Sequence, residues 1–117
     1  MEKFKERRKH PRVQLKKKIV GEIKTGITVT IIDISLTGVL VEVNTPLKIG
    51  SKCNLKINLD GKDFNVLGRV ERVYVHSLEK EAIIYRAGIN FEKISDDQMR
   101  ILKEYMNSLF KKEEKNE

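Results

Sequence analysis

The chain has little of what many functional classes require. It contains no Trp, one Cys, two Pro and two His among 117 residues. Cys53 cannot form a disulfide within the chain, and one cysteine with two distant histidines offers no metal-ligand spacing. No hydrophobic run approaches the roughly 20 residues that span a bilayer, and the charged N-terminus lacks the apolar segment of a secretory signal. We therefore expect a cytoplasmic protein without stable membrane insertion.

Catalytic signatures are also missing from the sequence. It has no glycine-rich phosphate loop, no dinucleotide-binding fingerprint and no GxSxG nucleophile motif. Cys53 stands at the expected start of a strand, where a small packing residue explains it better than a nucleophile does. We therefore expect a binding protein rather than an enzyme, with no cofactor and no metal.

Positive charge is concentrated at the N-terminus. The net charge is +7, and residues 1–18 contain nine Lys or Arg against Glu2 and Glu6, so the excess belongs to this segment. We interpret residues 1–18 as a basic N-terminal arm. Such an arm attracts phosphate groups on nucleic acid, lipid or a small nucleotide. Because it has little apolar content, we expect it to be mobile until a ligand orders it.

Residues 19–94 have the hydrophobic pattern of short β-strands. Tight turns are expected at Thr25-Gly26 and Asp60-Gly61, a bulge near Ile31-Ile32 and a polar loop over residues 77–80. The expected strands, each rich in β-branched or alternating apolar residues, are 19–24, 27–34, 39–43, 54–59, 64–75 and 83–91.

At residue 95 the pattern changes to that of a helix. Ser95 to Gln98 has the form of a capping box, with two acidic residues in the first turn. The apolar residues that follow recur at helical spacing, and they are Met99, Ile101, Leu102, Tyr105, Met106, Leu109 and Phe110. We expect an amphipathic helix over residues 95–112 and a frayed tail over 113–117. The sequence thus predicts an all-β domain, a small six-stranded antiparallel β-barrel with a C-terminal α-helix packed on it.

A first polar motif, Arg7-Arg8-Lys9-His10-Pro11-Arg12, lies in the arm. Proline disfavours a regular helix at this point, so the segment is better read as a turn or an extended stretch that directs several arginines to one place. A guanidinium group pairs bidentately with phosphate or with the O6/N7 edge of guanine, and its plane stacks on purines. Surface arginines in weak ion pairs are the alternative interpretation.

A second polar motif, Asp33-Ile34-Ser35-Leu36-Thr37-Gly38, ends the second expected strand. Strand alternation places Asp33 and Ser35 on one face and Ile34 in the core. Asp33 can accept hydrogen bonds from guanine N1–H and N2–H, and the Ser35 hydroxyl can donate or accept. Gly38 allows a positive φ or a close backbone approach. Taken alone, this motif fits an Asx or Ser turn better than a binding site.

Together the two motifs resemble the PilZ domain family, whose pattern is RxxxR followed about twenty residues later by D/NxSxxG. The strands around Gly68-Arg69-Val70 and Ala87 to Phe91 and the following helix also match, so the resemblance covers about Lys5 to Phe110. It implies a bacterial receptor for cyclic di-GMP. The residues that it assigns to the ligand are Arg8 and Arg12, for phosphates and guanine edges, and Asp33, Ser35 and Gly38, for the guanine site.

The resemblance also implies a stoichiometry, and the charge of the arm suggests how binding could be read out. Arg7 precedes the RxxxR motif directly, which in the family accompanies a stacked ligand dimer, so we expect two cyclic di-GMP molecules per protomer. The arm would order on the ligand, and an unidentified downstream protein would read the new surface.

Two alternatives remain open at this stage. One is a small basic β-barrel that binds single-stranded nucleic acid, which is disfavoured because the chain has few aromatic residues for base stacking. The other is a PilZ scaffold that binds no ligand, which the intact arginines argue against.

Overall fold

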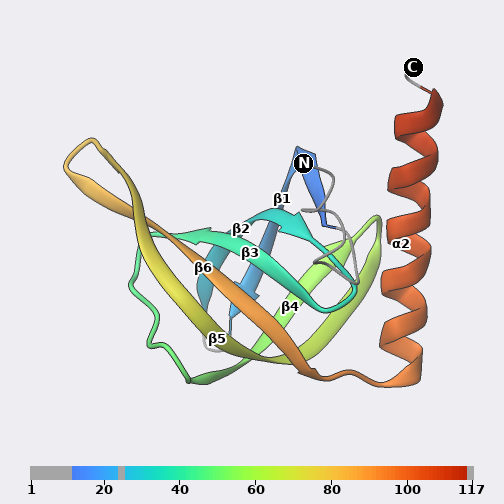
Figure 1. Ribbon diagram of the computed structural model, residues 1–117, viewed down its shortest axis with the longest axis horizontal. Coiled ribbons are helices and arrows are strands. Elements are labelled where there is room, and N and C mark those ends of the chain that lie inside the picture. The colour runs from blue at the N-terminus through green and yellow to red at the C-terminus, as the bar shows by residue number, and fades with distance from the viewer. Residues whose placement is uncertain (1–11, 24–25, 116–117) are drawn as a thin grey trace, which may run out of the picture.

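The computed structural model describes residues 12–23 and 26–115, which form a closed barrel of six strands followed by one helix (Figure 1). Every neighbouring pair is antiparallel, the strand order is β1-β2-β3-β6-β5-β4, and β4 closes the ring on β1. The elements are β1 (Val13–Ile23), β2 (Ile27–Ile34), β3 (Gly38–Val43), β4 (Lys52–Leu59), β5 (Lys62–Glu79), β6 (Ala82–Lys93) and α2 (Asp96–Lys115). The predicted fold class is confirmed.

Alternating apolar residues fill the barrel interior. In β4, Leu55, Ile57 and Leu59 are buried while the residues between them are exposed, as the strand period requires. Burial of one such aliphatic side chain stabilises the fold by about 1.5–3 kcal/mol. Phe64 of β5 is fully buried, and its ring meets that of Phe91 edge to face at 5.7 Å between centroids.

The hairpin turn between β4 and β5 is at the predicted place. Asp60 and Gly61 both have left-handed backbone, with φ of 55° and 91°, as a two-residue turn with matching strand twist requires. The Asn58 side chain accepts a hydrogen bond from the Gly61 N–H at 2.9 Å and supports this turn.

The first strand begins earlier than expected. Residues 13–18, which were assigned to the basic arm, belong to β1, because Val13 pairs with Ile34 and is buried inside the barrel. A register shift between Gln14 and Ile19 accommodates the intervening lysines. The lysines thus lie in an irregular part of the strand. Because this part lacks regular alternation of apolar and polar residues, the strand could not be predicted from the sequence.

The prediction of a polar loop over residues 77–80 is wrong. β5 continues to Glu79, and β6 begins at Ala82. The reversal takes two residues, Lys80 and Glu81, with φ of 49° and 67°. Cross-strand pairing of Leu78 with Ile83 holds the ends together. The result is a two-stranded ribbon that projects beyond the barrel, seen at the left of Figure 1.

The C-terminal helix begins as predicted but with a different capping arrangement. The Ser95 hydroxyl accepts a hydrogen bond from the Gln98 N–H at 3.2 Å. The Gln98 side chain does not complete the box; it accepts from the Asn65 N–H of β5 at 2.6 Å and ties the helix to the barrel. Leu102, Tyr105 and Met106 are buried against the barrel, whereas Phe110, expected to pack there, is 39% exposed.

Candidate functional site

A β-bulge directs Asp33 to the outer face of the barrel. Ile31 pairs with Val41 and Asp33 pairs with Leu40, so Ile32 is the extra residue and the predicted bulge is confirmed. After the bulge, Ile34 lies fully buried in the core, and Asp33 lies on the opposite, outer face.

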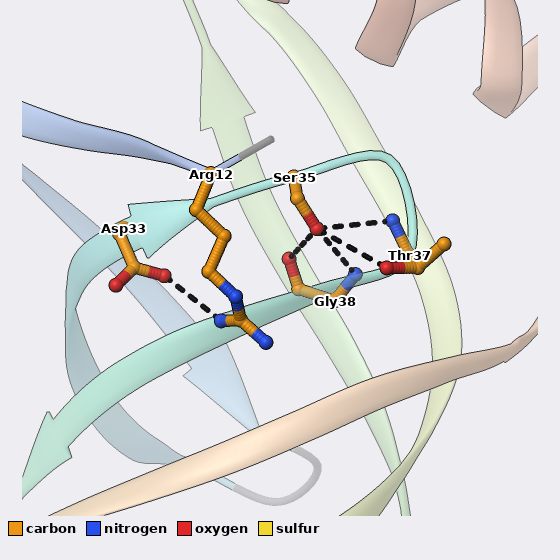
Figure 2. A network of polar contacts seen from close by, with 5 residues as sticks. All are labelled: Arg12, Asp33, Ser35, Thr37 and Gly38. Carbon is orange, nitrogen blue, oxygen red and sulfur yellow. Dashed lines mark hydrogen bonds and ion pairs between the residues drawn. The ribbon is translucent and has the colours of Figure 1, made fainter. Parts of the chain in front are cut away.

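Arg12 reaches Asp33 from the start of β1. Its Nη1 donates to Asp33 Oδ1 at 3.0 Å, and the two side chains are 24% and 19% exposed (Figure 2). Within the described residues this bond uses one of five guanidinium N–H groups and one carboxylate oxygen. The other oxygen of Asp33 and the remaining donors of Arg12 make no further side-chain hydrogen bond among the described residues, and the ion pair holds the two groups side by side.

Ser35 lies inside the turn that follows β2. Its side chain is buried, and its Oγ accepts hydrogen bonds from the N–H groups of Thr37 and Gly38, both at 3.2 Å (Figure 2). The Ser35 N–H donates in turn to the Gly38 carbonyl at 2.9 Å. The expected placement of Ser35 on the face of Asp33 is therefore corrected, because the strand ends at Ile34 and the chain turns before the alternation continues. This geometry makes Ser35 a residue that shapes the turn.

Gly38 is required by a close approach and not by a positive φ. A Cβ at this position would lie 2.6 Å from the Ile89 carbonyl oxygen and 3.2 Å from Asn90 Oδ1. The neighbouring Thr37 carbonyl accepts from the Phe91 N–H at 2.8 Å. The turn over residues 35–38 is thus fixed against β6, and it holds the end of β2, including Asp33, in place.

The cross-strand register places one more arginine in the row of Asp33. The row crosses four strands through the partners Asp33 of β2, Leu40 of β3, Gly88 of β6 and Arg72 of β5. A Cβ on Gly88 would lie 2.9 Å from Nε and 3.2 Å from Cγ of Arg72, so the Arg72 side chain lies across the Gly88 backbone. Leu40 and Gly88 are uncharged and buried, so the polar groups stand at the two ends of the row.

Arg72 differs from its neighbours in its ion pairs. Arg86 donates from Nε and Nη2 to Glu42 Oε2 at 3.0 and 2.9 Å. Arg69 donates to Glu92 at 2.6 Å, and this hydrogen bond, with the charges of Arg69 and Lys52, lowers the pKa of the Glu92 carboxyl. Arg72 has no acidic partner within the described part of the chain, so its charge is available to an anion.

Sequence reasoning missed Arg72 because register shifts interrupt β5 between Val70 and Arg72 and again between Val75 and Ser77. Each shift inverts the alternation of side chains along β5. The face on which Arg72 lies therefore cannot be deduced by alternation from the buried residues of the strand. A glycine at position 88, within a strand, was the available signal of a close approach.

Two surface hollows lined by described residues lie away from this row. Hollows of about 450 and 520 Å³ are lined mainly by Thr, Asn and aliphatic residues of β1 to β4 and contain no arginine. A smaller apolar hollow of about 240 Å³ lies between Leu36 of the motif turn and Met106 and Phe110 of α2. Within the described residues, we locate the candidate site from charge and hydrogen-bond geometry and not from the volume of a hollow.

Among residues 12–23 and 26–115 no cluster of His, Cys, Asp and Glu could hold a metal ion. No helix in that part of the chain is long and apolar enough to cross a membrane. Arg7 and Arg8 lie outside the described residues, so their assigned roles stay predictions.

These features define a small antiparallel β-barrel with a C-terminal helix and an arginine-bearing outer face. The family model described as PilZ domain matches residues 6–108, and the chain therefore belongs to the PilZ domain family. No curated protein matches the chain in sequence.

Three solved structures show the same fold. The PilZ domain of YcgR from Escherichia coli with c-di-GMP has a TM-score of 0.75 at 17% identity, and the match covers 94% of this chain and 96% of that one. The K. pneumonia MrkH–c-di-GMP complex has a TM-score of 0.75 at 21% identity, covering 94% and 55%. The Bacillus subtilis inhibitor of motility, MotI/DgrA, has a TM-score of 0.71 at 17% identity, covering 91% and 52%. The chain thus spans about half the length of MrkH and MotI.

Proposed function

We propose that this chain is a receptor for cyclic di-GMP and binds it on the outer face of β2, β3, β6 and β5. The observation that carries the proposal is the row with the Arg12–Asp33 pair at one end and an arginine without an acidic partner, Arg72, at the other. Membership of the PilZ family supports it, as do two structural neighbours whose structures contain c-di-GMP.

The Arg12–Asp33 pair has the chemistry to read one guanine. The free oxygen of Asp33 accepts from the N1–H and N2–H edge, and the remaining donors of Arg12 face the O6/N7 edge or a phosphate. Because each group orients the other before binding, little side-chain entropy is lost when the base arrives. Ser35 and Gly38 serve this site by fixing the turn behind Asp33.

Arg72 extends the site toward a second nucleotide. Three steps between neighbouring strands separate it from Asp33, or about 14 Å at about 4.8 Å per step. Two linked nucleotides can span this row, whereas one nucleotide cannot engage both ends. The Arg72 side chain lies across Gly88, and its guanidinium can stack on a purine or donate to a phosphate.

The basic arm completes the receptor in this proposal. Arg7 and Arg8 close over the ligand from the N-terminal side, and two stacked cyclic di-GMP molecules bind per chain. The ordered arm and ligand then present a new surface to a downstream protein, which is a disorder-to-order switch driven by phosphate charge.

Isothermal titration calorimetry with cyclic di-GMP tests the proposal. A charged hydrogen bond contributes about 1.5–3 kcal/mol, so Arg8→Ala, Arg12→Ala and Asp33→Ala should each weaken binding about tenfold to a few hundredfold. Arg100→Ala, on the exposed surface of α2, is the matched control and should bind as the wild type does. Wild-type affinity in all three site variants would refute the assigned site, and absence of binding to the wild type would refute the function.

Stoichiometry separates the role of Arg7 from the rest. The wild type should bind two ligands per chain, and Arg7→Ala should bind one. A single ligand on the wild type would reject the inference from Arg7 and leave the Arg12–Asp33 site standing. Single-stranded oligonucleotides and GTP should not compete at equal concentration, since neither presents two guanines across one phosphate ring.

A further inference from the structure

The ribbon of β5 and β6 carries most of the large apolar side chains that the described residues expose. Of seven such side chains, four lie on the ribbon: Tyr74 at 42%, Val75 at 61%, Leu78 at 69% and Ile83 at 43% exposure. Figure 1 shows the ribbon standing clear of the other four strands and of α2. These four side chains therefore lie outside the barrel core.

Cross-strand register sorts the ribbon residues into two faces. Val73, Val75 and Leu78 pair with Ala87, Tyr85 and Ile83, which are alternate residues of β6 and share one face. The other face carries Arg72, Tyr74, Ser77 and Glu79, whose partners are Gly88, Arg86, Ile84 and Ala82. One face of the ribbon is thus apolar, and the other mixes charged and polar side chains with Tyr74, Ile84 and Ala82.

The outer edge of β5 along the ribbon is open. Pairing with β4 ends where Lys52 meets Arg69, and the loop before β4 adds bonds to Val70 alone. Within the described residues no strand pairs with this edge from Glu71 to Glu79. The segment contains no proline and no lysine, two of the devices that protect an exposed edge from another strand, although it does carry three charged residues and two bulges.

The edge is complementary to itself when two copies run antiparallel. In the register that sets Val75 opposite His76, Arg72 faces Glu79, Val73 faces Leu78 and Tyr74 faces Ser77 of the second copy. The bulge at Val75–Ser77 makes the pairs of Arg72 with Glu79, Val73 with Leu78 and Tyr74 with Ser77 each share a face, as antiparallel pairing requires. The central pair is the exception, because His76 contacts Glu42 on the face opposite Val75. A shift by one residue brings Glu71 against Glu79, or Arg72 against Lys80, and like charges directly opposite each other are destabilising.

We propose that the chain forms a homodimer by antiparallel pairing of the β5 edges over residues 71–79, which joins the two ribbons into one four-stranded sheet. The like charges that a shift by one residue would bring together set the register. The backbone hydrogen bonds and the apolar pairs of Val73 with the second copy's Leu78, formed twice by symmetry, supply the affinity. Because strand pairing of this length buries less than about 1,200 Å², the dimer is of the weak, reversible class.

Sedimentation velocity over a concentration series measures the association. The wild type should shift from the 13.6 kDa of one chain toward twice that mass at concentrations up to about 1 mM, a range typical of weak interfaces. Leu78→Lys and Val75→Lys place charges in the apolar strip and should weaken dimerisation at least tenfold. The matched control is Val20→Lys, which adds the same charge at a 49% exposed valine on β1 and should dimerise normally.

Disulfide trapping tests the register. Val73→Cys with Leu78→Cys should yield a covalent dimer under mild oxidation. The two positions of one chain are about 16 Å apart along the strand, too far for a bond within the chain. Val73→Cys with Glu79→Cys places the thiols on opposite faces and should not be trapped. A wild type that stays monomeric, a Leu78→Lys variant that dimerises equally well, or equal trapping of both cysteine pairs would overturn the proposal.

Discussion

Replacement of Ser35 by Ala separates a residue that shapes the site from one that touches the ligand. The substitution removes the hydroxyl that accepts the N–H groups of Thr37 and Gly38 inside the turn. Thr37 is exposed, so water can replace the bond to its N–H. Gly38 is buried, and its N–H would lose its partner without access to solvent.

The expected cost follows from that burial. An unsatisfied buried donor costs about 1–3 kcal/mol, and the exposed bond adds at most a few tenths, so the free energy of unfolding should fall by about 1.5–3 kcal/mol. For a domain of this size the melting temperature should fall by about 5–15 °C. Thermal unfolding followed by circular dichroism measures the shift, and amide exchange should show faster exchange at Gly38.

Two controls make the reasoning refutable. Ser51→Ala removes a hydroxyl that donates to the Lys48 carbonyl in an exposed loop, and it should change stability by less than about 0.5 kcal/mol. Asp33→Ala breaks one ion pair between side chains that are 24% and 19% exposed but leaves the turn over residues 35–38 intact, so it should lower ligand affinity more than stability. An unchanged melting temperature for Ser35→Ala, or an equal loss for Ser51→Ala, would contradict a structural role of Ser35.

Three further predictions concern the same face. Gly38→Ala drives a methyl group against the Ile89 carbonyl and should destabilise the fold by about 1–3 kcal/mol in urea titrations. Arg72→Ala should weaken cyclic di-GMP binding about tenfold in calorimetry without changing the melting temperature, and Arg72→Lys should restore part of the affinity; equal affinity in all three proteins would remove Arg72 from the site. The Arg69 hydrogen bond lowers the pKa of Glu92 in the folded state, so this pair stabilises the fold above the usual carboxyl pKa and the gain is lost as the pH falls through the lowered value. Glu92→Gln should therefore lose less stability than the wild type between pH 7 and pH 3, as measured by urea midpoints.

The regular parts of the fold can be predicted from the sequence because each depends on local chemistry alone. β4 alternates without interruption, and the turn at Asp60-Gly61 needs two left-handed residues, so both follow from local chemistry. The start of β1 and the ribbon end of β5 were missed because bulges break the alternation there. A strand that changes face within its length gives no single period to recognise.

The candidate site divides in the same way. The bulge near Ile31-Ile32 and the polar character of Asp33 were predictable from local sequence, but the inward direction of Ser35 was not, since it depends on where pairing with β3 stops. Arg72 is sixty residues after Arg12, and its place in the row depends on the registers of three strand pairs. Such a residue is found from topology and not from spacing.

Different physical requirements therefore account for the different residues of the two motifs. Ser35 and Gly38 are fixed by backbone hydrogen bonds and by the close approach to β6, which the fold requires with or without a ligand. Asp33 and Arg12 share one side-chain ion pair, which holds no backbone turn in place. In a PilZ barrel that has lost its ligand, the serine and glycine should persist while the aspartate and arginines drift. The retention of Arg8, Arg12 and Asp33 in this chain is thus the part of the pattern that argues for binding.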